Sequence, residues 1–192
     1  MNNSKYKKSA QGTCYHLYNR GNNKRKIFIN DNDYKFYLNR LEQAYKKYNF
    51  ALISYCLMPN HVHLIVKQEG SFSPSKFISS LHTSYSMMFN KKYNLVGHLF
   101  QDRFKQKIIS DDRYMKNLII YIHYNPVKDK ICNLPKEYRW SSYLEYAKGK
   151  FLENNSGICK HELIEKYGLK GQSFEEFIKL AQHITSEDAF DA

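Results

Sequence analysis

The chain has 192 residues, of which 42% are hydrophobic, 25% charged and 16% aromatic, and its formal net charge is +12. This length and composition exclude a disordered or fibrous protein, and they fit one ordinary domain with a sizeable core and a small appendage. So basic a chain indicates a polyanionic partner, either nucleic acid or an anionic membrane.

The first part of the chain alternates between strand and helix patterns. A strand is predicted over residues 13–18, where β-formers roughly alternate, and a basic turn around Gly21 follows it. Asp31 or Asp33 is expected to cap a helix that runs to about Tyr48. Its predicted buried face consists of Tyr34, Tyr37, Leu38, Leu41 and Tyr45. Residues 51–57 and 61–67 read as two strands, and the turn at 58–60 predicts that they form a hairpin.

The next segments complete a split pattern. Ser73 followed by Pro74 is a helix start, with Ser as N-cap and Pro in the first turn. Residues 103–109 alternate as a fourth strand, and Asp111 or Asp112 begins another helix. We expect that helix to end near Asn125, because a residue before proline is disfavoured in helical space. The order predicts an α+β fold with a ferredoxin-like β-α-β-β-α-β core and one extra helix.

The C-terminal part differs from the rest in charge. Residues 1–150 hold 26 of the 30 Lys and Arg and 10 of the 18 Asp and Glu, a net charge of +16, whereas residues 151–192 carry −4. We therefore expect a basic domain at 1–150 that meets the polyanion and a small acidic extension at 151–192, with short helices at 160–167 and 173–184 and a capping box at Ser173 and Glu176. No CxxC pair, secretion signal or membrane span is visible, so we expect a cytoplasmic protein with no membrane partner.

His61 and His63 flank Val62 inside the third predicted strand. Side chains alternate along a strand, so both imidazoles point to one face and could share a metal ion. An isolated His-x-His pair is more often just two polar positions on a half-exposed strand. The apolar neighbours Leu64, Ile65 and Val66 make this a core strand, where unpaired histidines are costly.

Tyr121 and Asn125 stand four residues apart near the end of the last long helix, and therefore share one face. On this reading a phenol and an amide oxygen are presented together. The alternative is a helix with amphipathic tyrosines at its rim. Tyr124 is a rival nucleophile because it lies only about 60° around the helix from Tyr121.

The two features together predict one site. A metal ion held by His61, His63 and the Asn125 oxygen would polarise a phosphodiester. Tyr121 would attack phosphorus and form a phosphotyrosine, which a DNA hydroxyl can reverse. Two imidazoles bind Zn²⁺ and other transition-metal ions in preference to Mg²⁺, and Mn²⁺ is a compromise between these two classes of ion.

Basic residues around this site are candidates for phosphate contacts. Arg103, Lys105 and Lys107 are expected to share one face of the fourth strand, and Arg20, Lys24 and Arg25 cluster at the Gly21 turn. A solvated surface is the alternative for each of them.

Several motifs resemble a known family. Met58 to Leu64 (MPNHVHL) resembles the His-hydrophobic-His motif of the single-tyrosine HUH transposases of small bacterial insertion sequences. Residues 15–21 (YHLYNRG), 97–105, 121–127 (YIHYNPV) and 140–143 (WSSY) resemble the REP-associated tyrosine transposase branch. The resemblance covers about residues 12–146.

The resemblance implies a metal-dependent enzyme that nicks and joins hairpin-associated single-stranded DNA with Mg²⁺ or Mn²⁺. It assigns Tyr121 as nucleophile and His61, His63 and Asn125 as metal ligands. The insertion-sequence branch usually has Gln at the position of Asn125. Its members suggest a homodimer, whereas the REP-associated branch suggests a monomer, which we favour.

Two other classes of protein remain open. A catalytically inactive nucleic-acid-binding protein would show the same charge and tyrosine content. A structural zinc protein needs four closed ligands, and the four cysteines are not spaced to supply them.

Overall fold

The computed structural model describes residues 11–148, 158–167, 179 and 181. Apart from residues 179 and 181, the helix predicted over 173–184, with its capping box, lies outside these residues. The elements in chain order are β1 Cys14–Arg20, η1 Asn22–Lys24, α1 Asp31–Tyr48, β2 Phe50–Met58, β3 His61–Gln68, α2 Pro74–Tyr93, β4 Lys105–Ile109, α3 Asp112–Lys128, η2 Pro135–Glu137, α4 Tyr143–Lys148 and α5 His161–Tyr167.

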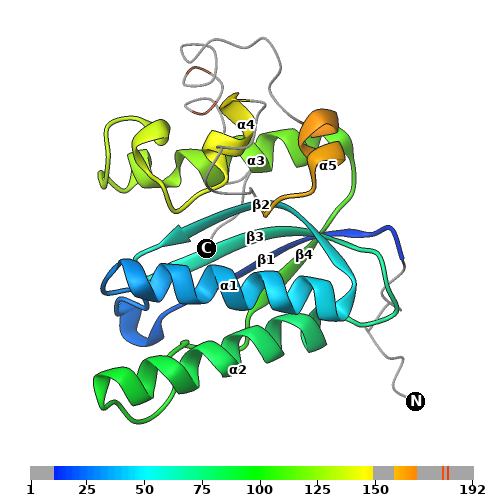
Figure 1. The fold of residues 1–192 in the computed structure, drawn as a ribbon. Helices are drawn as coiled ribbons and strands as arrows, with labels where there is room; N and C mark the ends of the chain where they lie inside the picture. The colour runs from blue at the N-terminus through cyan, green and yellow to red at the C-terminus, as the bar shows by residue number, and fades with distance from the viewer. Residues whose placement is uncertain (1–10, 149–157, 168–178, 180, 182–192) are drawn as a thin grey trace, which may run out of the picture.

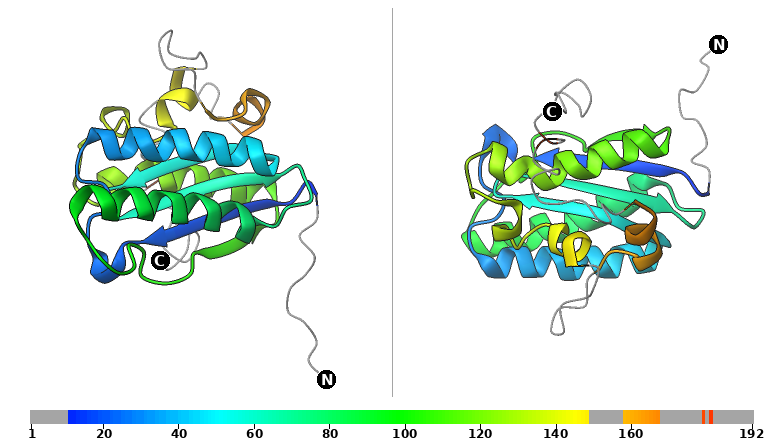
Figure 2. Two further views of the ribbon diagram at one scale, coloured as in Figure 1. Left: turned by 60° about the horizontal axis from the view of Figure 1, so that its bottom comes forward. Right: turned by 90° about the horizontal axis from the view of Figure 1, so that it is seen from above.

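A four-stranded sheet lies between two layers of helices (Figure 1). The strand order is β2-β3-β1-β4, and all neighbours are antiparallel. Helices α1 and α2 cover one face, while α3, α4 and α5 lie over the other (Figures 1 and 2). The predicted α+β class, the element order and the hairpin of β2 with β3 are confirmed.

The face covered by α1 and α2 holds the apolar residues of the strands. Leu17, Val62 and Leu64 are wholly buried there, as are Tyr37 and Tyr85 of the helices. The predicted helix face of α1 is confirmed, since Tyr34, Tyr37 and Leu41 are buried, while Leu38 and Tyr45 are half-buried against the core. Burial of this apolar area is the main stabilising term of the fold.

The N-cap of α1 is Asn30, so the expectation of Asp31 or Asp33 was wrong. The Asn30 side chain accepts a hydrogen bond from the Asn32 amide, and Asp33 accepts one from the Asn30 amide at 3.1 Å. Asn caps a helix as well as Asp, and an acidic residue three positions later completes a capping box. The N-caps Ser73 of α2 and Asp111 of α3 are as predicted.

Helix α3 continues through Pro126 to Lys128, so the predicted end near Asn125 was also wrong. Pro126 is buried in the last turn, where its missing N–H removes a single helical bond. The chain beyond it still satisfies the terminal carbonyls. The amide of Asp129 donates to the Asn125 carbonyl at 2.9 Å, and that of Ile131 donates to the Pro126 carbonyl at 2.8 Å.

The fourth strand begins at Lys105 rather than Arg103, so Arg103 does not belong to the predicted strand stripe. Register places Lys105 opposite Tyr18, and Lys107 opposite His16. These two lysines therefore do share the α3 face of the sheet.

No helix of the described residues is long and apolar enough to cross a membrane.

The segment 158–167 packs onto the same core as the sheet. The amide of Lys160 donates to the Leu52 carbonyl at 2.8 Å, and its ammonium group pairs with Glu69 at 2.6 Å. Leu163, Ile164 and Tyr167 of α5 are buried in the main core cluster. The division of the chain at residue 150 stays a prediction.

Candidate active site

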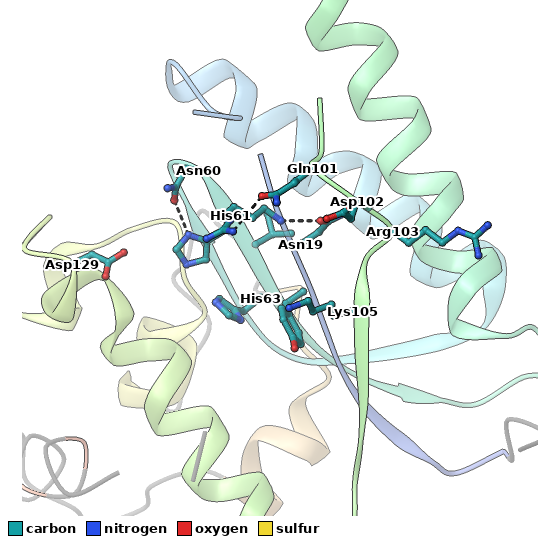
Figure 3. Close-up of a pocket in the computed structure, with 12 residues that line it drawn as sticks. Asn19, Asn60, His61, His63, Gln101, Asp102, Arg103, Lys105 and Asp129 are labelled. Carbon is teal, nitrogen blue, oxygen red and sulfur yellow. Dashed lines mark hydrogen bonds between the residues drawn. The ribbon is translucent and has the colours of Figure 1, made fainter. Parts of the chain in front are cut away.

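His61 and His63 lie on the α3 face of the sheet, where a cavity of about 280 Å³ opens between β1, β3 and the segment before β4 (Figure 3). Register pairs His61 with Arg20, and His63 with Tyr18. The two imidazole rings are perpendicular, with centroids 5.0 Å apart. Strand alternation therefore brings both histidines to one cavity, as predicted. The residues that line it are Tyr18, Asn19, Arg20, Asn60, His61, Val62, His63, Gln101, Asp102, Arg103, Lys105 and Asp129.

Both imidazoles are neutral at pH 7. Burial lowers the pKa of His61 to about 4, with Asp129 acting in the opposite direction. Burial also lowers the pKa of His63 well below its usual value, helped by the neighbouring His61 and His16. A neutral imidazole is the form that binds a metal ion.

Tyr121 of α3 lies beside His63. Their rings meet edge to face with centroids 6.3 Å apart, and the ammonium group of Lys128 sits 5.3 Å from the Tyr121 ring centre. Tyr121 is half-buried against the main core cluster. Tyr124 packs elsewhere, against a second cluster formed by Ile120, Tyr143 and Ala181.

Asn125 occupies the turn of α3 between two residues that face the histidines. Tyr121 is one turn before it, and Asp129, which lines the cavity, is one turn after it. Residues spaced by four share a helix face, so Asn125 points to the same side. Asn125 is only 5% exposed, and its amide nitrogen has no hydrogen-bond partner among the described residues.

The donor atoms fit a metal site only if Asn125 takes part. Within the described residues, no group of three or more His, Cys, Asp and Glu side chains could hold a metal ion. His61 and His63 supply two nitrogens. The third predicted ligand, Asn125, is not one of these four residue types. The set of two imidazoles and an amide oxygen suits a transition-metal ion, Mn²⁺ included, better than Mg²⁺.

The predicted basic residues divide into two groups. Arg20, Arg103 and Lys105 line the cavity, whereas Lys24, Arg25 and Lys107 do not. Arg20 donates to the Gln101 side chain at 3.2 Å, and Arg25 donates to the His98 carbonyl at 2.8 Å. Arg25 thus joins the Gly21 turn to the loop before β4.

A second cavity of about 630 Å³ adjoins the first and shares Asn19, Asp102 and Arg103 with it. It lies between α2 and the loop before β4. One wall is a row of small polar side chains on α2, and the buried His82 stacks on Phe100 with ring centroids 4.0 Å apart. The full set of lining residues is Asn19, Ser75, Ser79, His82, Thr83, Ser86, Met87, Asn90, Gly97, His98, Leu99, Phe100, Asp102, Arg103 and Phe104.

Comparison with known proteins decides the family. The model of the family described as "Transposase IS200 like" matches residues 9–125, which include β1, the histidine pair, Tyr121 and Asn125. The chain belongs to the IS200-like transposase family. A protein of Haemophilus influenzae whose name places it among the REP-associated tyrosine transposases is 30% identical over 136 residues, which are 63% of this chain and 77% of that protein.

A solved structure extends the likeness to the fold. The structure of a REP-associated tyrosine transposase bound to a REP hairpin superposes with a TM-score of 0.63 at 17% identity, over 77% of this chain and 86% of that one. Together with the Haemophilus relative, it confirms the resemblance to the REP-associated branch of the IS200-like transposases.

Sequence reasoning missed several residues that the structure places in or beside the candidate site. Asp129 was missed because the helix was expected to end near Asn125. The four-residue spacing of Tyr121, Asn125 and Asp129 was therefore not followed to its third residue. His16 and Tyr18 were missed because their place beside His63 depends on the pairing of β1 with β3. The alternation of His16, Tyr18 and Arg20 along one strand was the available signal.

Proposed function

We propose that this IS200-like transposase is a divalent-metal-dependent enzyme that nicks and rejoins single-stranded DNA through a phosphotyrosine at Tyr121. The observation that carries this proposal is the edge contact of Tyr121 with His63, since it sets a phenol of α3 beside the histidines that line the cavity. The β-α-β-β-α-β order and the strand order support a ferredoxin-like catalytic core.

His61, His63 and Asn125 are the proposed ligands of Mg²⁺ or Mn²⁺. Such an ion would act as a Lewis acid on the scissile phosphate and lower the barrier to attack on phosphorus. The amide nitrogen of Asn125 is buried and has no hydrogen-bond partner in the part of the chain that the structure describes, which supports a role for this side chain beyond packing, because buried polar groups usually have a partner.

Tyr121 performs the covalent step. Its phenolic oxygen bonds to phosphorus while the bond from phosphorus to one deoxyribose oxygen breaks, and the released sugar oxygen takes up a proton. A DNA hydroxyl then attacks the phosphotyrosine, which restores the phenol and joins the strand. The ammonium group of Lys128 makes a cation–π contact with the Tyr121 ring, which holds this ring beside a positive charge.

Tyr121 is a better nucleophile candidate than Tyr124 on packing grounds. Tyr124 packs against Tyr143 and Ala181, in a cluster separate from the core that contains the histidines. The alternative of an inactive binding module keeps the basic surface but assigns no purpose to neutral, cavity-lining imidazoles beside a tyrosine.

The proposed substrate is single-stranded or hairpin DNA. Arg20, Arg103 and Lys105 would contact phosphates at the cavity, and the outer residues Lys24, Arg25 and Lys107 would extend the basic surface. The adjoining second cavity leaves room for a strand beyond the scissile phosphate. Binding of a REP hairpin by a structural relative supports this class of substrate.

We infer a monomeric active site. Tyr121 lies beside His63 of the same chain, and α3 packs on its own sheet. One copy of the chain therefore contains the nucleophile and the three proposed ligands.

The test is formation of a covalent adduct between the purified protein and labelled hairpin DNA with single-stranded flanks. With Mn²⁺ we expect a band that survives denaturing electrophoresis, and no band with chelator or for Tyr121→Phe. Tyr124→Phe is the matched control and should retain the band. If the protein binds the hairpin but forms no adduct with any divalent ion, it is a binding module and the enzyme proposal is wrong.

A further inference from the structure

His61 and His63 each use the same ring nitrogen for a contact within the protein. Nδ1 of His61 lies 2.6 Å from Oδ1 of Asn60, and Nδ1 of His63 lies 3.0 Å from Nε2 of His16. In both rings Nε2 is thereby left for the cavity. Neither Asn60 nor His16 is among the proposed ligands.

The contact at His61 fixes where its proton lies. An amide oxygen only accepts hydrogen bonds, so the proton must be on Nδ1 of His61 and the lone pair on Nε2. Asn60 is itself oriented, because its amide nitrogen faces the Lys24 carbonyl at 3.5 Å. This leaves the amide oxygen turned toward the imidazole (Figure 3).

The contact at His63 is enclosed. His16 is 1% exposed and His63 is 3% exposed, so water does not compete for this hydrogen bond. The two rings are nearly parallel, at 16°, and Tyr18 is close to parallel with both, at 24° to His16 and 22° to His63. The packed rings prevent His63 from flipping, and flipping is the only motion that would exchange its two nitrogens.

We propose that Asn60 and His16 are positioning residues that hold both imidazoles as the Nδ1–H form, with the Nε2 lone pairs directed at one metal ion. His16 accepts the proton of His63 through Nε2. The opposite arrangement, in which His16 donates, would leave a proton on the His63 nitrogen that faces the cavity and would block ligation. A partner on the second ring nitrogen is the usual way in which proteins orient a histidine ligand.

This inference rests on the proposed metal-dependent function, but its first test needs no metal. Full-length protein with ¹⁵N-labelled histidine is examined by long-range ¹H–¹⁵N NMR in the presence of chelator. We expect both His61 and His63 as the Nδ1–H form. In His16→Phe we expect His63 to lose this preference, and in Asn60→Ala we expect the same of His61.

The second test is Mn²⁺ affinity, measured by electron paramagnetic resonance. His16→Phe and Asn60→Ala should each bind Mn²⁺ about 10–100-fold more weakly. His16→Gln keeps an acceptor for His63 and should stay within about threefold of wild type. The matched control is His82→Phe, which removes another buried, hydrogen-bonded imidazole from the opposite side of the sheet and should change neither readout.

The outcomes separate the two proposals. A wild-type His63 with its proton on Nε2, or His16→Phe with unchanged Mn²⁺ affinity, would overturn the positioning role even if the metal binds tightly. Correct tautomers in a protein that binds neither Mn²⁺ nor Mg²⁺ would overturn the metal site itself, and the positioning role with it.

Discussion

Asn125 distinguishes a metal centre from a pair of buried histidines. The described residues offer no third His, Cys, Asp or Glu that could complete a metal site, and Asn125 is buried on the helix face that includes Tyr121 and Asp129. The proposed metal site therefore depends on its amide oxygen as the third donor.

We predict that Asn125→Leu binds Mn²⁺ at least about tenfold more weakly than wild type, because it keeps the volume and removes the oxygen. Asn125→Gln keeps the amide and should lose much less. Electron paramagnetic resonance of free Mn²⁺ measures both, and thermal unfolding checks that each variant folds. Equal affinity of Asn125→Leu and wild type would exclude Asn125 as a ligand.

The residues of the site differ in how far the sequence reveals them. His61 and His63 were predictable because strand alternation is local. The shared helix face of Tyr121 and Asn125 was predictable because the four-residue spacing is also local. His16 was not, since it lies 47 residues before His63 and their contact depends on how β1 pairs with β3. Asp129 was not, because Pro126 predicted that the helix ends before it. In the structure the amides of Asp129 and Ile131 bond to the last helical carbonyls, so the helix continues past the proline.

Helix α3 is anchored to the sheet by a buried polar cluster. His123 Nε2 lies 3.0 Å from the Ser54 hydroxyl and 2.8 Å from the Ser142 hydroxyl, and the Tyr55 amide donates to Ser142 at 2.9 Å. The cluster joins α3, β2 and the segment before α4. It therefore sets the position of Tyr121, two residues away from His123.

We predict that Ser142→Ala lowers the free energy of unfolding by about 1–3 kcal/mol, because it removes the side-chain partner of the buried Tyr55 amide and one of the two hydroxyl partners of the buried His123 imidazole. Urea unfolding measures the change. Ser79→Ala, on the exposed side of α2, is the control and should change stability by less than about 0.5 kcal/mol. A Ser142→Ala variant as stable as the control would show that the cluster does not anchor α3.

The distribution of charge over the whole molecule predicts how DNA binding responds to salt. Each cation that contacts a phosphate of single-stranded DNA adds about 0.7 to the magnitude of the slope of log K against log salt. Arg103→Gln and Lys105→Gln, at the cavity, should each reduce the slope by about this amount. Lys35→Gln, on the exposed side of α1, should not. Equal slopes for all three variants would show that the DNA phosphates do not contact the cavity.

Buried histidines predict how the stability of the metal-free protein depends on pH. Burial lowers the pKa of His16, His82 and His123 to about 3 and that of His61 to about 4. The unfolded chain, with values near 6.5, takes up protons first as the pH falls. The contribution of the buried histidines to the free energy of unfolding is therefore fully present above about pH 6.5. Below that pH it decreases by about 1.4 kcal/mol per pH unit for each histidine.

Urea unfolding in chelator between pH 7.5 and 5 measures this loss. His82→Gln removes one of the buried imidazoles, so it should make the pH dependence shallower by the share of one histidine. A free energy of unfolding that stays constant or rises as the pH falls would contradict the burial of neutral imidazoles.

The central claim concerns which tyrosine bonds to DNA, and peptide mapping of the adduct tests it directly. Tryptic cleavage after Lys116 and Lys128 places Tyr121 and Tyr124 on one peptide, residues 117–128. After nuclease trimming of the Mn²⁺-dependent adduct, fragmentation by mass spectrometry locates the nucleotide within this peptide. The account predicts a nucleotide on Tyr121 alone. A nucleotide on Tyr124, or on a peptide from another part of the chain, would contradict it.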